Sequence, residues 1–306
     1  RIRELENFGI YFRLVDGKNC GDKEQMFHDA QTNHTANVYF SNVGQKNFEK
    51  IPGCPIGYWV SNNFIQLFDY GTIKDNLDTR QGLATGDNDS FLRQWFEIDK
   101  RKFSANTDST DSALVSGFKW FPYRKGGSAR KWYGNRDYVI AFDPKSFETL
   151  SNQGNHLPSR HMYFKEAVTW SLTSSGFTAF RYYPQGGVFD VNGMSMFNME
   201  LSVLSYLNSK ICTELLRMIN PTLASQKGDI DKLPYLDAKG IDLSEYTNKN
   251  ISIAKSDWDS HETSWDFEAN PLVALCNKQT TDYSDLSEKK ESEQSEQSVV
   301  SNEKFS

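Results

Sequence analysis

A run of basic and aromatic residues at positions 119–136 carries the clearest chemistry in this sequence. It holds six cationic residues, five aromatic residues and no acidic residue, with Gly126-Gly127 near its centre. Cationic side chains bind phosphates and guanidinium groups read guanine edges, while glycine lets backbone approach a ligand. The run therefore indicates nucleic-acid binding, and a solvated hairpin whose tryptophans simply pack is the structural alternative.

A second polar segment, residues 81–93, contains two glycines together with Asp, Asn and Ser side chains. Thr85 and Asn88 have the groups needed to bond bases or phosphates. The segment lacks the lysine of a phosphate-binding loop and the GxGxxG spacing, so a nucleotide cofactor site here has little support. An Asx-rich turn is the alternative that sequence physics alone favours.

A third segment, residues 158–181, adds Arg160, Lys165 and Arg181 to the predicted basic surface. His156 and His161 have no second pair of metal ligands beside them, which argues against zinc. We predict phosphate contacts from Lys119, Lys125, Lys131 and Lys165, base contacts from Arg124, Arg130, Arg136, Arg160, Asn88 and Asn135, and further contacts from Thr85, Arg93 and Arg181.

The charge distribution supports a polyanionic partner better than the net charge does. The 306 residues carry a net charge of -6, but residues 80–235 hold 19 Lys and Arg against 15 Asp and Glu, a net of +4. Residues 1–79 have a net of -2 and residues 236–306 a net of -8. Because salt screens charges beyond about 10 Å, the local excess matters most to a bound polyanion.

The sequence gives no sign of a membrane segment, a disulfide framework or a catalytic centre. No apolar run reaches the roughly 20 residues of a membrane helix, and four widely spaced cysteines fit a reducing cytoplasm. No Pro-Pro occurs, so the loop with which amino-methyltransferases hold a flipped base is missing, as is a glycine-rich turn for S-adenosylmethionine. The N-terminus has no initiator Met and reads as a cut within a longer protein.

Hydrophobic periodicity predicts an α+β fold with a mostly antiparallel, irregular sheet or barrel, flanking helices and a helical C-terminal segment. Aromatic and β-branched stretches predict strands at 9–15, 138–142, 168–172, 178–183 and 187–191. Helical spacing predicts helices at 58–68 and 199–219, a turn at 226–234 and partly helical structure at 236–280. The chain divides by composition into three regions, residues 1–50, 51–235 and 236–306, and the last of these ends in an acidic, frayed tail.

These segments together resemble the C-terminal region of the PglX-type adenine-specific DNA methyltransferases of BREX phage-defence systems. The resemblance covers most of the chain, in many ordered stretches. It rests on residues 47–61, 82–93, 119–135, 163–171, 188–191, 220–222, 228–230, 257–260 and 262–267. His261 departs from the aromatic residue expected between Ser260 and Glu262.

The resemblance implies a larger enzyme with an S-adenosylmethionine-dependent catalytic domain, a target-recognition domain and a helical spacer, of which this chain supplies the last two. It assigns residues 1–50 to a connector from the catalytic domain, residues 51–235 to the DNA target-recognition domain, and residues 236–306 to the helical spacer with its acidic tail. Double-stranded DNA is the implied partner, with other phage-defence proteins as further partners. No catalytic residue and no cofactor are carried over to this chain, and no membrane is implied. The alternatives are the recognition domain of a fused type II restriction–methylation enzyme, a protein-docking module using residues 236–306, and a binder of single strands or RNA.

Overall fold

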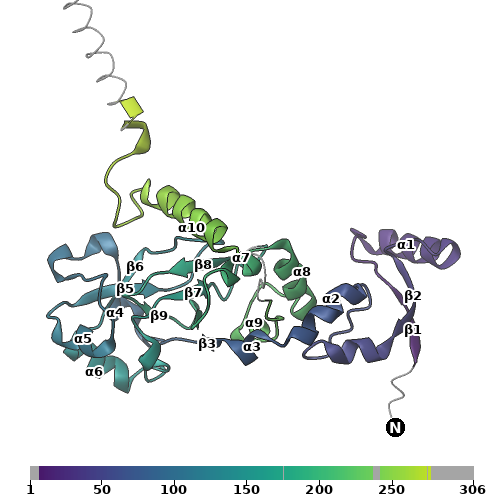
Figure 1. The fold of residues 1–306 in the computed structure, drawn as a ribbon, viewed down its shortest axis with the longest axis horizontal. Coiled ribbons are helices and arrows are strands. Elements are labelled where there is room, and N and C mark those ends of the chain that lie inside the picture. Colours follow the sequence, from purple (N-terminus) through teal and green to yellow (C-terminus); the bar gives the residue numbers. More distant parts are fainter. Residues whose placement is uncertain (1–6, 175, 237–241, 274, 277–306) are drawn as a thin grey trace, which may run out of the picture. The chain divides into compact units, whose positions relative to one another are not determined.

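The computed structural model describes residues 7–174, 176–236, 242–273 and 275–276. The chain divides into two compact units, Arg1–Ala254 and Lys255–Ser306. The first unit contains two four-stranded sheets, a two-stranded hairpin and short helices (Figure 1). This confirms the predicted α+β class, but the strands form separate open sheets and not a barrel. The predicted tail after residue 282 lies outside the described residues, and the three predicted region boundaries remain predictions.

The first sheet has the strand order β3-β10-β7-β8, and its neighbours pair antiparallel. Val168, Trp170, Phe180 and Met196 of this sheet are buried against helices on one side. The burial of these large side chains supplies the main driving force for this half of the unit. The strands are β3 (Asp78–Arg80), β7 (Ala167–Trp170), β8 (Phe180–Tyr183) and β10 (Ser195–Phe197).

The second sheet has the order β4-β6-β5-β9 and contains the exception to antiparallel pairing. β5 pairs antiparallel with β6 but parallel with β9, with Tyr123 opposite Val188. Its core is rich in aromatic residues, including Phe121, Phe142 and Phe189, all fully buried. The strands are β4 (Leu92–Gln94), β5 (Trp120–Arg124), β6 (Tyr138–Ala141) and β9 (Val188–Phe189).

Short helices connect and cover these sheets. Four of them begin after a Ser or Asp whose side chain accepts a hydrogen bond from the first turn: Ser61, Asp87, Ser109 and Ser209. The α-helices are α2 (Asn62–Gln66), α3 (Ile73–Asn76), α4 (Asn88–Phe91), α5 (Thr110–Val115), α6 (Pro144–Asn152), α7 (Val203–Leu207), α8 (Lys210–Ile219), α9 (Lys227–Ile230) and α10 (Ser244–Asp259).

The N-terminal residues form a hairpin, β1 (Phe8–Phe12) with β2 (Tyr39–Gly44), joined by helix α1 (Cys20–Asn33). One face of β1 packs on the segment before α2, where Tyr11 stacks on Tyr58 with ring centroids 4.8 Å apart. The Tyr58 hydroxyl also donates to the Phe12 carbonyl at 3.1 Å. The strand predicted at 9–15 is observed as the shorter strand β1. These contacts show that β1 packs against other residues of this chain.

The helix predicted at 199–219 is interrupted, and the physical reason is Asn208. Its side chain forms two hydrogen bonds with the Phe180 backbone, accepting from the amide at 3.1 Å and donating to the carbonyl at 2.9 Å. Ser209 then caps a new helix, α8, by accepting from the Cys212 amide at 3.1 Å. The apolar stripe continues across the break, so hydrophobic periodicity alone concealed it.

Two further sequence predictions are corrected. The helix predicted at 58–68 begins only at Asn62, because Ser61 caps it by accepting from the Phe64 amide. The turn predicted at 226–234 contains the short helix α9, which begins with a capping box between Gln226 and Asp229.

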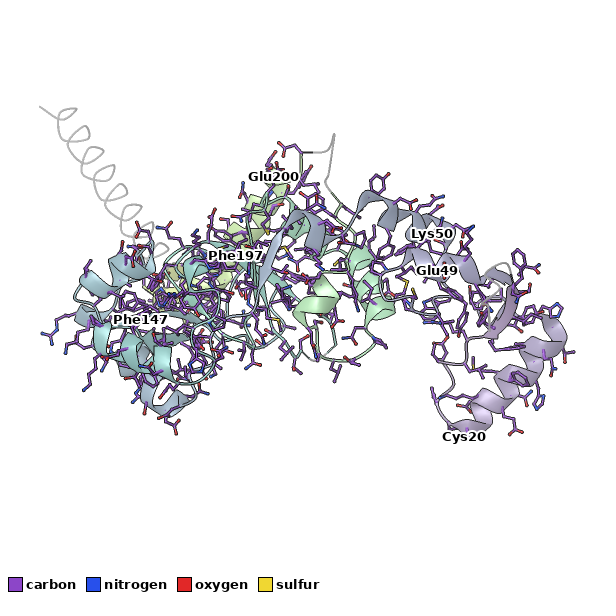
Figure 2. The ribbon with its side chains drawn as sticks, turned by 90° about the horizontal axis from the view of Figure 1, so that it is seen from below. Cys20, Glu49, Lys50, Phe147, Phe197 and Glu200 are labelled. Carbon is purple, nitrogen blue, oxygen red and sulfur yellow. The ribbon has the colours of Figure 1, made fainter. Side chains whose placement is uncertain are left out.

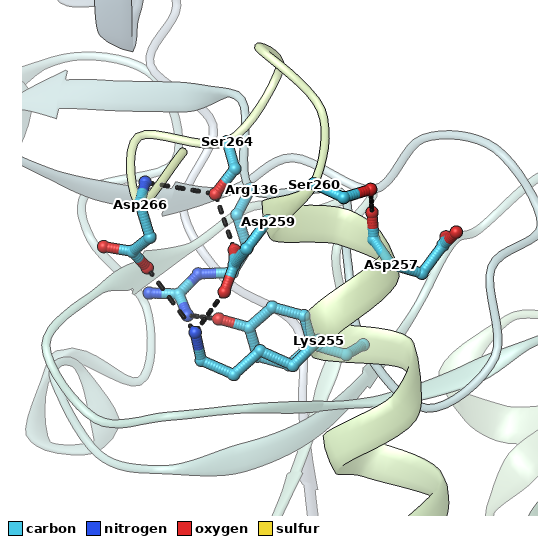
Figure 3. A network of polar contacts seen from close by, with 8 residues as sticks. Arg136, Lys255, Asp257, Asp259, Ser260, Ser264 and Asp266 are labelled. Carbon is cyan, nitrogen blue, oxygen red and sulfur yellow. Dashed lines mark hydrogen bonds and ion pairs between the residues drawn. The ribbon is translucent and has the colours of Figure 1, made fainter. Parts of the chain in front are cut away.

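In the second unit, the last turn of α10 and the residues after it form a polar network (Figure 3). Lys255 pairs with Asp259 and lies 4.0 Å from Asp266. The Ser264 hydroxyl donates to Asp259 at 2.7 Å, and the Asp266 amide donates to the Ser264 oxygen at 3.1 Å. Part of the sequence block at 257–267 thus has a structural role in ending the helix.

Candidate nucleic-acid interface

Three loops of the first unit emerge at one edge of the second sheet. Leu83 bridges Asp190 in parallel, and β9 runs parallel to β5, so these three segments share one direction. Residues 84–88, residues 190–193 and the β5–β6 loop (residues 125–137) follow them at their carboxyl ends. We call this the loop edge. It gathers residues that are far apart in the sequence.

The β5–β6 loop is held against the other sheet. The Trp132 amide donates to the Phe180 carbonyl at 2.9 Å, and the Tyr182 amide donates to the Trp132 carbonyl at 2.8 Å. The loop thereby adds a single bridge to β8, which is the outer strand of the first sheet. Asn135 closes the loop by donating to the Ser128 carbonyl at 2.8 Å. These bonds give the loop a defined shape.

Two glycines in this loop have positive φ values and lie close to other residues of the chain. Gly126 has a φ of +94°, and a Cβ added there would lie 2.9 Å from the Asn192 carbonyl oxygen. Gly127 has a φ of +121°, and its Cβ would meet the Asn135 side chain at 3.0 Å. L-residues rarely adopt such φ values. The Gly-Gly pair therefore allows the loop to pack closely against other residues of this chain.

Arg124 is the last residue of β5, and its side chain points into the core, with only 1% exposed. Its guanidinium donates to the Lys165 carbonyl and to the Ser195 hydroxyl, the latter at 3.4 Å. Its Cζ lies 4.4 Å from the centroid of the Tyr183 ring. Burial lowers the pKa of Arg124 to about 10, so the group keeps its charge at neutral pH. Arg124 does not face the loop edge.

Arg136 and Arg181 are buried as well. Arg136 donates to the Tyr133 hydroxyl, and its Cζ lies 5.0 Å from the Tyr183 ring centroid. Arg181 donates to the Ser171 hydroxyl at 2.9 Å, and burial lowers its pKa to about 10. A desolvated cation over an aromatic face gains about 2 kcal/mol. These arginines support the fold around the loop.

The partly exposed cations of the loop are Lys125, Arg130 and Lys131. The Lys125 ammonium lies 5.6 Å from the Tyr138 ring, and Lys131 donates to the Asn208 carbonyl at 2.7 Å. Burial raises the pKa of Asp137, and the charge of Arg130 opposes this effect. Lys131 is therefore tied to the end of α7, whereas Lys125 and Arg130 lie near groups of their own loop and the start of β6.

Lys119 lies at the opposite end of β5 from the loop edge. Its amide donates to the Lys102 carbonyl at 2.9 Å, which places it beside the exposed residues Lys100, Arg101 and Lys102. Sequence reasoning overlooked this second basic group, although the signal, three successive cations, was present. The basic run at 119–136 is therefore divided between two ends of a strand.

Arg160 and Lys165 precede β7, whereas Ser171, near Gly126, follows it. Arg160 and Lys165 are exposed and line a cavity of about 490 Å³. Lys165 also lines a neighbouring cavity of about 530 Å³. Phe147 lines the smaller cavity, and Phe197 and Glu200 line the larger one. Figure 2 labels these three side chains. Acidic residues share these walls, so the cavities are not uniformly basic. The structure does not bring this pair together with the loop cations.

The segment around Thr85 belongs to the loop edge but is mostly internally bonded. The buried Thr85 hydroxyl donates to Asn88 at 2.7 Å, and Gln153 donates to the Thr85 carbonyl at 2.7 Å. Arg93 donates to the Leu92 carbonyl at 2.6 Å. Asp87 caps the short helix α4 that follows, and Asn88 remains the exposed candidate of this segment.

Asp190, which follows β9, has a structural role. It accepts from the Tyr123 hydroxyl at 2.7 Å and from the Asn192 amide at 2.6 Å. Burial raises its pKa, while hydrogen bonds and the Lys125 ammonium act in the opposite direction. Asp190 fixes the turn beside the β5–β6 loop.

Two features are absent from the part of the chain that the structure describes. No three His, Cys, Asp or Glu side chains there are grouped to hold a metal ion. None of the helices among the same residues has the length and apolar character needed to span a bilayer.

Fold and site define an α+β protein segment with a structured basic loop at one sheet edge. No protein-family model matches the chain. It is 37% identical over 285 residues to the "Adenine-specific methyltransferase PglX" of Lacticaseibacillus casei (strain Zhang), covering 89% of the chain and 24% of that protein. It is 35% identical over 306 residues to the "Adenine-specific methyltransferase BrxX" of Escherichia coli O9:H4 (strain HS), covering 96% and 23%.

These relatives confirm the resemblance found in the sequence. Over nearly its whole length the chain is homologous to part of the PglX and BrxX adenine-specific methyltransferases, consistent with a C-terminal region of such a protein. The chain spans about a quarter of the length of the curated relatives it matches.

Proposed function

We propose that this chain is the DNA target-recognition part of a site-specific adenine DNA methyltransferase that acts in BREX-type phage defence. The observation that carries the proposal is its homology to the two adenine-specific methyltransferases, PglX and BrxX. S-adenosylmethionine and the transfer chemistry then belong to the remainder of the full-length protein. The chain's task is to hold a duplex so that the target adenine can leave the base stack.

The loop edge supports this task. Lys125 and Arg130 are partly exposed on a loop of defined shape, and Asn88 is exposed on a neighbouring one. Phosphate contacts from Lys125 set the register of the duplex, and Arg130 with Asn88 supply base contacts. Arg124, Arg136 and Arg181 support this surface from behind and make no base contact.

The test is a fluorescence anisotropy titration of mixed-sequence duplex DNA with the protein that carries this chain, across a salt series. We expect affinity to fall steeply as salt rises, because each phosphate contact releases a counterion. A single-stranded oligonucleotide of the same sequence is the control. No duplex binding at low salt, or preference for the single strand, would contradict the proposal.

A further inference from the structure

The buried ring of Tyr183 contacts two arginines, one at each end of the β5–β6 loop. Arg124 immediately precedes the loop, and Arg136 lies two residues before β6. Their Cζ atoms are 4.4 Å and 5.0 Å from the Tyr183 ring centroid. Residues twelve positions apart thus share one aromatic partner.

The ring belongs to the other sheet. Tyr183 is the last residue of β8, pairs with Ala167 of β7, and is 1% exposed. The loop rises from β5 and β6 of the second sheet but rests on β8 through Trp132. Tyr183 therefore fixes the stems of the loop to the strand that its middle also contacts.

The contacts of Arg124 explain why an aromatic side chain suits position 183. Its guanidinium already donates to a carbonyl and a hydroxyl, and the Tyr183 and Phe189 rings cover it at 4.4 Å and 6.0 Å. An aromatic face attracts a cation without directing it to a single angle. Two guanidinium groups can therefore be held by one side chain, although like charges repel each other.

We propose that Tyr183 is a positioning residue for DNA recognition: by holding Arg124 and Arg136 it fixes the shape of the β5–β6 loop and so the placement of Lys125 and Arg130. This inference rests on the proposed function. Tyr183 itself touches no DNA, because its side chain is buried.

The experiment compares Tyr183→Leu, which removes the aromatic face, with Tyr183→Phe, which keeps it. Phe142→Leu is the matched control, since Phe142 is also fully buried but packs on Phe147, Tyr163 and Phe164. Hydrogen exchange followed by mass spectrometry on the full-length protein reports the loop amides, including the Trp132 amide bonded to Phe180. Duplex affinity is measured on the same samples.

We expect Tyr183→Leu to speed exchange of the loop amides at least about tenfold and to weaken duplex binding about tenfold. Tyr183→Phe should match the wild type, and Phe142→Leu should leave the loop amides unchanged. Unchanged loop exchange in Tyr183→Leu would overturn the inference, and so would faster exchange with unchanged duplex affinity. Equal acceleration in Phe142→Leu would overturn it too, by showing only general destabilisation.

A further variant distinguishes failure of the positioning role of Tyr183 from failure of the proposed function. Lys125→Ala combined with Arg130→Ala removes both cations from the loop and leaves Tyr183 in place. If that variant binds duplex as the wild type does, DNA recognition by the loop is wrong, whatever Tyr183 does to exchange. If it binds weakly while Tyr183→Leu binds normally, only the positioning role is wrong.

Discussion

The buried arginines and the partly exposed cations of the same loop region have opposite environments. Arg124 and Arg181 are each 1% exposed and bond to protein oxygens, whereas Lys125 and Arg130 are partly open to solvent. Arg124 is the last residue of β5, whose residues are all buried, whereas Lys125 begins the loop. A basic run in a sequence is therefore not by itself a basic surface.

The strongest change should come from removing a buried arginine. Arg124→Ala deletes the hydrogen bonds to Lys165 and Ser195 and the contact with the Tyr183 ring. We expect the free energy of unfolding to fall by about 3 kcal/mol, since bonds to charged groups contribute about 1.5–3 kcal/mol each. Denaturant titration measures this, with Lys125→Ala as the neighbouring control. Equal stability of the two variants would contradict the contrast between them.

The next effect concerns binding. The double variant Lys125→Ala with Arg130→Ala should weaken duplex affinity about tenfold while leaving the unfolding free energy within about 0.5 kcal/mol. The slope of log affinity against log salt should shrink by about 0.9 for each phosphate that the variant no longer binds. Anisotropy titration at several salt concentrations measures both. A fall in stability as large as that of Arg124→Ala would remove the distinction between the two groups.

A smaller effect is expected at the far end of β5. Lys119→Ala lies in the second basic group, beside Lys102, away from the loop edge. We expect duplex affinity to change less than about twofold, because a single distant exposed charge is screened by salt. The same titration at moderate salt tests this. A reduction equal to that of the loop variant would instead extend the DNA surface to both ends of the strand.

The weakest effect is a pH dependence at Asp190. Because burial raises its pKa above the ordinary value of 3.8, its stabilising contribution is complete below that value and is lost as pH rises through the folded-state pKa. Asp190→Asn cannot ionise. The stability of the wild type relative to this variant should therefore fall as pH rises above about 4. Parallel curves in urea unfolding at each pH would show that Asp190 does not titrate in this window.

Local patterns in the sequence predicted the fold class and many strands. The stretches at 138–142 and 168–172 correspond to β6 (Tyr138–Ala141) and β7 (Ala167–Trp170), because β-branched and aromatic runs favour a pleated, buried surface. The helix at 199–219 was predicted as one piece, since its apolar spacing is unbroken. Asn208 breaks it through bonds to Phe180, 28 residues away, which no local window contains.

The candidate site was predicted in part. Composition identified the cationic and aromatic block and its glycine pair. It gave Arg124, Arg130 and Arg136 the same role, because residue type does not report direction. It also passed over Lys100, Arg101 and Lys102, which only the pairing of Phe103 with Trp120 brings beside Lys119.

Residue type and order were enough to establish the α+β class, the kinship with adenine-specific methyltransferases and the location of the basic block. Which of the cations are exposed depends instead on the tertiary structure. The parallel pairing of β5 with β9 gathers three distant loops at one edge, and the Tyr183 ring draws Arg124 and Arg136 into the core. Such arrangements depend on contacts between segments far apart in the chain, which local spacing does not encode.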